Sequence, residues 1–348
     1  MKPLTGKSGT NLLIGIILAL AIAAAVIALV TTDRTAKKGS RLGPEFGYDL
    51  TEQKKIDPAL ILYREAAPVI KTALQKPTAL AVGPHDRIYV AGDREICVFD
   101  SQAKPLPKIK LTSEPRCLAV AHDGTIYLGI QDHIEVYNDQ GKKLAAWESL
   151  GDKAVLTAVA VGKNDVFVTD AGNRVVVRYD KSGRLLSFIG KKDPDRNIPG
   201  FNVPSPYFDL AIAPDGLLRV VNPGNLMIEA YTFDGDREFW WGKPSTNSID
   251  GFSGCCNPVN FALLPNDEGF VTAEKGLTRI KIYDPAGKFV GVVAGPETFA
   301  EHDRILSGKG QGNLEGGLDV AVDSQNRVLV LDPLTDEIRI FTRKTKNL

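Results

Sequence analysis

The sequence has few of the residues that build compact metal or redox sites. It contains only four cysteines and four histidines in 348 residues. Four cysteines are too few to staple a chain of this length, so we expect a hydrophobic core to hold the fold together. A zinc site favours several histidine or cysteine ligands, which the sequence scarcely supplies.

An excess of charge of either sign is also missing. Lysine plus arginine equals aspartate plus glutamate, 42 each. Proteins that bind nucleic acid present a basic face with aromatic residues, and no basic cluster is visible along this chain. We therefore expect no nucleic-acid partner, and any charged partner must bind to a local group of charged residues.

Helical periodicity is scarce beyond residue 55. Short runs of alternating or continuous β-branched residues recur there between turn signals. The 33 glycines and 21 prolines fit a folded chain that is rich in turns. This pattern predicts an all-β fold for residues 56–348.

One long apolar run is present near the N-terminus. Residues 12–30 (LLIGIILALAIAAAVIALV) carry no charge, and a helix of that length spans most of a bilayer's hydrocarbon core. A cleaved signal peptide is the alternative, but its apolar region is typically about 7–15 residues. We predict an uncleaved transmembrane helix at 12–30, preceded by a tail at 1–11 and followed by a polar linker at 31–55.

The orientation of this helix is ambiguous from its flanking charges. Basic residues lie on both sides, with a slight excess after the helix. Counted literally, the positive-inside rule leaves the C-terminal part in the cytoplasm, although a large folded domain behind an N-terminal anchor can be exported despite such a bias. We expect a single-pass membrane protein with an extracytoplasmic domain.

Six similar segments follow one another in the rest of the chain. Their first strands read PTALAV, PRCLAV, TAVAV, FDLAIA, VNFALL and LDVAV. Each segment holds three strands, and a short fourth strand follows in all but the last. Six four-stranded units spaced by roughly 40–60 residues are the signature of a six-bladed β-propeller. A marker aromatic residue late in the third strand falls at Phe99, Tyr137, Tyr179, Phe233, Tyr283 and Phe341.

The sixth segment lacks a fourth strand of its own. The upstream stretch PVIKTALQKPTALAV aligns with PKIKLTSEPRCLAV, which indicates a fourth strand from Val69 to Leu74 without a blade. We expect this strand to pair beside Glu337–Thr342 and so to close the ring and cover its edge.

Two stretches of the sequence resemble the NHL repeat. VTDAGNRVVVRYDKSGRLL (Val168–Leu186) is similar to its second half and SGKGQGNLEGGLDVAVDSQNRVLVLD (Ser307–Asp332) to its first half. The resemblance covers residues 68–343 and implies a six-bladed propeller, although such folds say little about chemistry. Some NHL domains bind RNA, but through the basic face that this chain lacks.

Several six-bladed propeller enzymes, of the lactonase-like or lyase-like type, resemble this architecture and hold a divalent metal in the channel. That resemblance alone implies a metal-dependent enzyme as an alternative function. The residues themselves show neither a calcium-binding spacing nor a set of nucleophile, base and orienting group. We therefore expect no catalytic residues and no cofactor.

Three long connections predict the functional surface. They span about residues 191–205, 242–257 and 296–317 and leave the same face of a propeller. Loops longer than about 12–15 residues are usually functional or disordered, which favours a binding or scaffold module for a protein or small ligand. The partner-binding residues expected there are Lys191, Lys192, Arg196, Trp240, Trp241, Asn247, Asp250, Cys255, Cys256, Asn257, Glu301, His302 and Asp303.

Two pairs in these connections have alternative interpretations. Trp240 and Trp241 either stack on a partner or, by strand alternation, place one ring in the core and the other at the surface. Cys255 and Cys256, in GFSGCCNP, are either free thiols or a disulfide between neighbours, with a metal site less favoured. A redox role in a membrane assembly is a third functional hypothesis. Cys97 and Cys117 are expected to be buried as small hydrophobic residues.

Overall fold

Antiparallel four-stranded sheets follow one another along the computed structural model, which describes residues 15–24, 51–245, 247–308 and 316–345. Blade 1 contains β2 (Pro77–Val82), β3 (Ile88–Gly92), β4 (Glu95–Phe99) and β5 (Pro105–Lys110). Blade 2 contains β6 (Cys117–Val120), β7 (Ile126–Gly129), β8 (Ile134–Tyr137) and β9 (Lys143–Ala146). Blade 3 contains β10 (Leu156–Val161), β11 (Asp165–Asp170), β12 (Val175–Asp180) and β13 (Leu185–Ile189).

The second half of the chain repeats the arrangement. Blade 4 contains β14 (Leu210–Ile212), β15 (Leu218–Asn222), β16 (Met227–Tyr231) and β17 (Arg237–Trp241). Blade 5 contains β18 (Asn260–Leu263), β19 (Phe270–Glu274), β20 (Arg279–Tyr283) and β21 (Phe289–Ala294). Blade 6 contains β22 (Asp319–Val322), β23 (Val328–Asp332), β24 (Glu337–Arg343) and, from the other end of the domain, β1 (Tyr63–Lys71).

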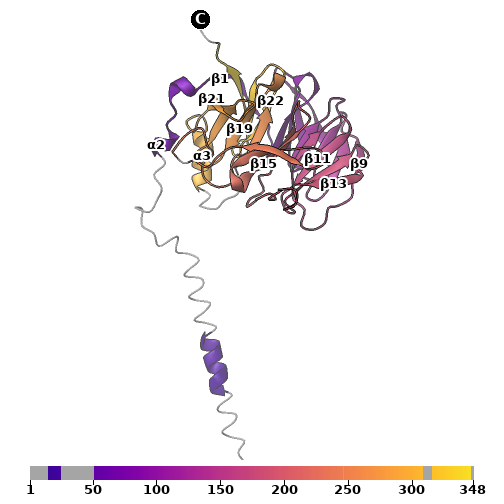
Figure 1. Ribbon diagram of the computed structural model, residues 1–348, viewed down its shortest axis with the longest axis vertical. Coiled ribbons are helices and arrows are strands. Elements are labelled where there is room, and N and C mark those ends of the chain that lie inside the picture. The colour runs from indigo at the N-terminus through magenta and orange to yellow at the C-terminus, as the bar shows by residue number, and fades with distance from the viewer. Residues whose placement is uncertain (1–14, 25–50, 246, 309–315, 346–348) are drawn as a thin grey trace, which may run out of the picture. The chain divides into compact units, whose positions relative to one another are not determined.

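The first strands of the six blades surround a central channel. Each of β2, β6, β10, β14, β18 and β22 contacts the first strand of the next blade, and β22 contacts β2. The contacts therefore form a closed ring of blades, and Figure 1 labels strands from several of them. The predicted all-β, six-bladed propeller with four-stranded blades is confirmed.

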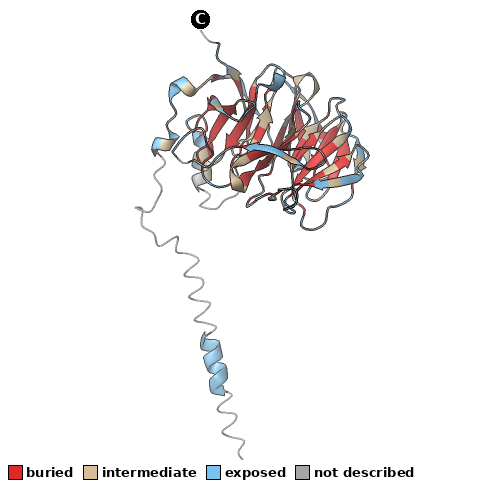
Figure 2. Cartoon of the chain, viewed as in Figure 1, coloured by how far each residue is buried: buried red, intermediate tan, exposed pale blue. Residues whose placement is uncertain are grey.

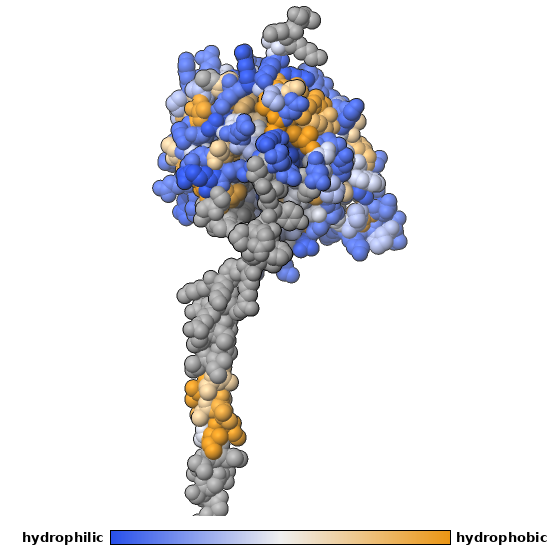
Figure 3. All heavy atoms as spheres, turned by 90° about the vertical axis from the view of Figure 1, so that its left-hand side faces the viewer, coloured by the Kyte–Doolittle hydropathy of each residue, from blue (hydrophilic) through white to orange (hydrophobic). Residues whose placement is uncertain are grey.

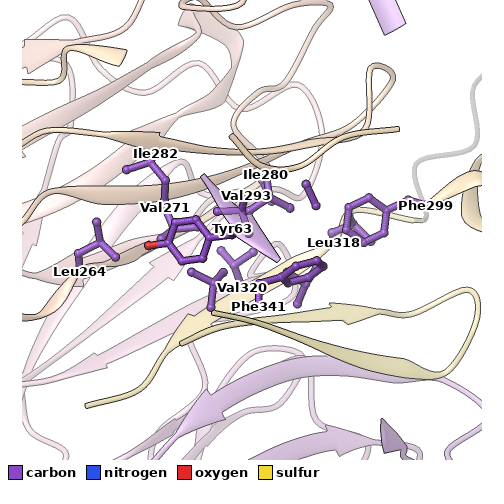
Figure 4. Close-up of a cluster of buried hydrophobic side chains, with 14 of the residues drawn as sticks. Tyr63, Leu264, Val271, Ile280, Ile282, Val293, Phe299, Leu318, Val320 and Phe341 are labelled. Carbon is purple, nitrogen blue, oxygen red and sulfur yellow. The ribbon is translucent and has the colours of Figure 1, made fainter. Parts of the chain in front are cut away.

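The ring is closed by the N-terminal strand of the domain. β1 pairs antiparallel with β24, with Ile70 opposite Ile338. Closure is as predicted, but the strand begins at Tyr63 and ends at Lys71, because a bulge after Ala66 lets the preceding residues join the ladder. Figure 4 shows Tyr63 among buried side chains of blades 5 and 6, so β1 also fills the core between them.

The marker aromatic residue is misplaced by sequence alignment in one blade. Tyr231 of β16 lies opposite Leu218, as Tyr283 of β20 lies opposite Phe270 in blade 5. The marker in blade 4 is therefore Tyr231, and the expected Phe233 lies in the turn that follows. The expectation was wrong because β16 ends two residues earlier than the aligned aromatic.

Side-chain acceptors fix the turns between third and fourth strands. Asp180 Oδ1 accepts backbone N–H bonds from Ser182 (2.9 Å) and Arg184 (3.1 Å). Asn138 accepts equivalent bonds in blade 2 from residues two and four positions on. These are the turn-forming bonds for which aspartate and asparagine are preferred, and they explain the recurring Asp/Asn and Gly signals.

Burial falls from the middle strands of each blade toward the rim. β3, β7, β15, β19 and β23 are buried throughout, whereas the outermost β13 and β17 expose most of their residues (Figure 2). The apolar clusters lie mostly between neighbouring blades, as in the set that joins blades 5 and 6. The blades therefore stabilise one another as well as themselves.

Few helices accompany the strands. In the described residues of the propeller unit they are α2 (Thr51–Lys54), α3 (Ala300–Gly308) and the short 3-10 turns η2 (Pro58–Leu60), η3 (Pro84–Asp86), η4 (Pro223–Asn225) and η5 (Pro265–Asp267). In the separate N-terminal unit, residues 15–24 are helical. Among the described residues, no helix is both long and apolar enough to cross a membrane. The remainder of the predicted 12–30 span, and residues 31–50 of the predicted linker, lie outside the described residues.

Candidate functional site

One face of the propeller carries the connections between consecutive blades, and we call it the loop face. The connections after blades 1 and 2 are short, from Lys110 to Cys117 and from Ala146 to Leu156. Those after blades 3, 4 and 5 are much longer, the longest running from Ala294 to Asp319 and containing α3. The face therefore has an open sector over blades 1 and 2 and a built-up sector over blades 3 to 5.

A polar residue stands at the start of the innermost strand in every blade. In order from blade 1 to blade 6 these residues are Thr78, Arg116, Thr157, Asp209, Asn260 and Asp319. We call this set the inner ring. Because the first strands surround the channel, the inner ring lies around the mouth of the channel on the loop face.

Five members of the inner ring form hydrogen bonds to the next blade. The donors and acceptors are Thr78 Oγ1 to Pro115 O (2.9 Å), Thr157 Oγ1 to Phe208 O (2.6 Å) and Asn260 Nδ2 to Leu318 O (2.8 Å). The carboxylates accept instead, Asp209 Oδ2 from Phe261 N (2.9 Å) and Asp319 Oδ2 from Leu80 N (2.7 Å). The step from blade 2 to blade 3 has no such bond, because the side chain of Arg116 forms no hydrogen bond or ion pair with any described residue.

Burial perturbs the two acidic members of the inner ring. Burial, and then the nearby charge of Asp319, raises the pKa of Asp209 to about 8. Burial raises the pKa of Asp319 itself to about 6. The backbone N–H bonds that both carboxyls accept oppose these increases. Low dielectric around the channel therefore disfavours negative charge at two of the six positions.

Two cavities lie on the loop face and share part of their lining. The channel cavity, of about 540 Å³, occupies the mouth of the channel and is lined by five inner-ring residues, all but Asp209, and by Tyr207. The radial groove, of about 1120 Å³, runs outward between blades 1 and 2 as far as Arg94 and Gln131. Gln75, Lys76, Thr78 and Arg116 line both cavities. We call the two together the depression.

The walls of the depression are held by local hydrogen bonds. Asp93, after β3, accepts backbone N–H bonds from Gln75 (2.9 Å) and Lys76 (3.0 Å). Asp170 holds the backbone of Val155 in the same way in blade 3 (3.0 Å). Tyr207 accepts a bond from the backbone N–H of Gly317 (2.9 Å) and so joins two of the long connections at the edge of the channel cavity.

The basic residues expected in the first long connection are used at the surface of blades 3 and 4. Arg196 forms an ion pair with Asp236 (2.5 Å). The ammonium group of Lys191 lies 4.0 Å from the ring centre of Phe188, and Lys192 is exposed. These contacts attach the first long connection to the rim of the propeller.

The polar residues expected in the second connection also stabilise it. Asn257 is fully buried; its Oδ1 accepts a bond from Lys275 N (3.0 Å) and its Nδ2 donates to Ser253 O (2.5 Å). Asp250 pairs with Lys243 (2.7 Å), while Asn247 is exposed. Asn257 is therefore positioned as a structural anchor of the connection.

The third connection places its expected residues on α3. His302 is buried, with Nδ1 2.8 Å from Asp332 Oδ1 at the end of β23. Asp303 accepts a bond from Thr278 Oγ1 (2.6 Å). Glu301 is exposed and pairs with Arg304 within the helix (2.5 Å). Two of the three side chains therefore attach α3 to the blades.

The two tryptophans follow the alternation of β17. Trp241 is 7% exposed and packs on Phe252, Phe270 and Tyr283, whereas Trp240 is 54% exposed. Gly287, with φ of 78°, lies against the Trp241 ring so closely that a Cβ would meet it at 2.2 Å. Placing one ring in the core and one at the surface is confirmed as the arrangement of this pair.

All four cysteines are free thiols. Cys97 and Cys117 are buried, as predicted, and burial raises the pKa of Cys117 to about 12. Cys255 is exposed, while Cys256 is buried with a positive φ of 64°. Burial also raises the pKa of the Cys256 thiol, which lies near Ser205 of the first long connection. The pair therefore lies where two long connections meet.

The expected residues and the cavities lie in different sectors. Within the described part of the chain, none of the partner-binding residues expected from the sequence lines either cavity. The sequence reasoning missed Arg116, Lys76 and Arg94, which lie in or beside short connections. The alignment of PTALAV with PRCLAV could have identified Arg116, since the second residue of the motif is Thr78 in one copy and Arg116 in the next.

Metal binding gains no support from the side chains of the described residues. No group of three or more His, Cys, Asp or Glu among them is placed to hold a metal ion. The metal-dependent enzyme stays a prediction from resemblance.

Comparison with known proteins identifies the architecture alone. No protein-family model matches the sequence, and a search of curated proteins finds no match. Similar solved structures include the WD40 repeats of RRP9, with a TM-score of 0.55, 12% identity and coverage of 81% of this chain and 100% of that chain. A protein of unknown function from Bacteroides thetaiotaomicron has a TM-score of 0.54 and 13% identity, with coverage of 81% of this chain and 72% of that chain. Virginiamycin B lyase from Staphylococcus aureus has a TM-score of 0.51 and 12% identity, with coverage of 81% of this chain and 100% of that chain. At such low identity these neighbours show that the chain has a β-propeller fold.

Proposed function

We propose that the protein is a membrane-anchored, non-enzymatic binding module that takes its partner in the depression on the loop face. One observation carries the proposal: the depression presents basic side chains that have no partner among the described residues, whereas most of the expected polar residues of the surrounding long connections are bonded within the protein. Free polar groups in a concave site are those available to a ligand.

The ring geometry supports binding without rearrangement. The inner ring bonds five of the six pairs of neighbouring blades, and the apolar clusters fill the spaces between blades. A preorganised site loses little conformational entropy when a partner binds. The long connections then act as a fixed wall beside the depression. Because similar propellers range from a lyase to WD40 repeats, the fold does not identify the function, which must be argued from the site.

The proposed anchor is supported by the apolar run at residues 12–30. Ile16, Ile17, Leu18 and Leu20 expose at least half of their surface in the described helix, which Figure 3 shows as hydrophobic. A surface helix of a soluble protein would carry a polar face. We further propose that the propeller is of the NHL type and that it is extracytoplasmic, because a large folded domain behind an N-terminal anchor can be exported despite a weak bias of the flanking basic residues.

Site-specific photocrosslinking in cells that make the full chain tests the binding function. A photoreactive residue is placed at Ser113 or Glu114 in the radial groove, and at His122 or Asp139 in turns of the opposite face as matched controls. We expect the groove positions to form the same discrete adduct and the control positions to form none. Equal adducts from both faces, or no adduct above the unirradiated sample from the groove, would overturn the proposal.

A further inference from the structure

We infer that the depression binds a short acidic peptide segment of a protein partner, and that Arg116 pairs with a carboxylate of that segment. The inference rests on the binding function proposed above and specifies its partner. It follows from one departure in an otherwise regular ring of residues.

Arg116 differs from the other inner-ring members in that its side chain forms no bond to the next blade in the described structure. The other five each bond to the next blade, whereas the exposed Arg116 side chain has no hydrogen bond or ion pair to any residue that the structure describes. It also lines both the channel cavity and the radial groove. A guanidinium group at this junction presents a planar set of donors that matches a carboxylate in two-point geometry.

The charges around Arg116 favour an anionic ligand. Lys76 and Arg94 also line the groove, are exposed and form no side-chain bond within the described ranges. Of the carboxylates, Asp93 is occupied by two backbone N–H groups and Asp319 by those of Leu80 and Val320. Glu114 adds one exposed negative charge. Among the described residues that line the depression, three free cations thus face one free carboxylate, and opposite charge on the ligand is the complementary arrangement.

The shape of the depression fits a short extended chain. The groove runs from the innermost strands to the turn between β3 and β4 at Arg94, across strands that lie about 4.8 Å apart. An extended residue spans about 3.3 Å, so roughly three residues cover this distance. At the inner end, the channel cavity has an apolar wall that suits an aliphatic side chain, formed by Leu156, Pro206, Tyr207, Leu331, Pro333 and Leu334.

The same observations favour a peptide over a nucleic acid. Nucleic acids are held by longer rows of cations along the backbone and by aromatic side chains that stack on bases. Here three cations are available, and Tyr207 is the one aromatic residue among those that line the depression in the described structure. Its ring already faces the ammonium group of Lys275 (4.6 Å).

Fluorescence anisotropy with the purified full chain in detergent tests the inference. The probes are labelled synthetic decapeptides that keep the same leucines and change stepwise from acidic to basic, together with a labelled oligouridine. We expect affinity to rise with acidity and to fall with added salt. Arg116→Gln should weaken binding of the most acidic peptide about tenfold, and Arg116→Lys should weaken it less.

Arg64→Gln is the matched control, since Arg64 is exposed on β1 outside the depression. It removes the same charge and should leave affinity unchanged. Affinity that is independent of peptide acidity, or equal losses in Arg116→Gln and Arg64→Gln, would contradict the inference, as would tighter, Arg116-dependent binding of oligouridine. Groove crosslinks at full yield in Arg116→Gln would overturn the inference and leave the binding function standing, whereas their absence from the unaltered chain would remove both.

Discussion

The open and built-up sectors of the loop face use their polar residues in opposite ways. In the built-up sector, most of the polar side chains that suggest a site are bonded within the protein, as His302 is to Asp332. In the open sector, short connections leave the side chains of Arg116, Lys76 and Arg94 without a hydrogen bond or ion pair to any residue in the described ranges. Loop length is therefore a poor guide to available chemistry here, because a long loop needs internal bonds in order to fold.

Buried charged side chains attach the built-up sector to the blade beneath it. Lys281 of β20 is fully buried; its ammonium group pairs with Glu274 (2.9 Å) and donates to the backbone carbonyls of Ile249 (3.0 Å) and Gly251 (2.7 Å). Arg279 pairs with the other oxygen of Glu274 (2.7 Å). Burial lowers the pKa of Lys281 to about 8 although Glu274 opposes this. The second long connection is thus attached through a buried ion network.

The largest expected effect is that of removing the shared carboxylate of this network. Glu274→Ala leaves two cations buried without their partner, and breaking a buried ion pair in this way costs about 3–5 kcal/mol. We expect the free energy of unfolding to fall by that amount in urea titrations. Glu301→Ala, which removes an exposed pair in the same sector, should cost about 0–1 kcal/mol. Similar losses of unfolding free energy in both variants would show that the buried ion network contributes no more stability than the exposed ion pair.

Adjacent tryptophans offer a second contrast within one strand. Trp241→Ala removes a buried ring that packs on three aromatic side chains, which costs about 3–5 kcal/mol in well-packed cores. Trp240→Ala removes an exposed ring and should change the free energy of unfolding by about 0.5 kcal/mol or less. Thermal and urea unfolding of the two variants measure the difference. A large loss for Trp240→Ala would assign the exposed ring a structural role.

The inner ring gives a pH dependence whose sign follows from burial. The pKa of Asp209 is raised by burial and by Asp319 to about 8, above the value of about 3.9 in an unfolded chain. The folded state therefore binds this proton more tightly, and the resulting stabilisation is complete below about pH 4 and lost as pH rises through about 8. We expect the free energy of unfolding to decrease between about pH 5 and 8.

Asp209→Asn should flatten this decrease because the group no longer titrates. Asp139→Asn, in an exposed turn, is the matched control and should leave the slope of stability against pH unchanged. The measurement is urea unfolding at intervals across the pH range. A variant slope that equals that of the unaltered protein would mean that Asp209 is charged in the folded state at neutral pH.

Sequence patterns predicted the architecture because repetition amplifies weak signals. Six copies of the strand pattern fixed the blades, and the single spare strand near Val69 predicted closure with β24, although a bulge extended that strand back to Tyr63. The location of the depression could not be predicted in the same way. Whether His302 or Arg116 is free depends on contacts between blades, and such contacts are made by residues far apart in the chain.

The smallest effect concerns the two cysteines of GFSGCCNP, which lie where two long connections meet. Cys255 is exposed and Cys256 is buried, and the thiolate is the form that reacts. We expect iodoacetamide to label the native chain first at Cys255 and the denatured, unreduced chain at all four cysteines, as measured by mass spectrometry. Cys255→Ser should abolish the fast label and Cys97→Ser, at a buried position, should leave it unchanged. Two labels in the denatured, unreduced chain would instead identify a disulfide between Cys255 and Cys256, and would make the built-up sector, rather than the open one, the place to look for redox chemistry.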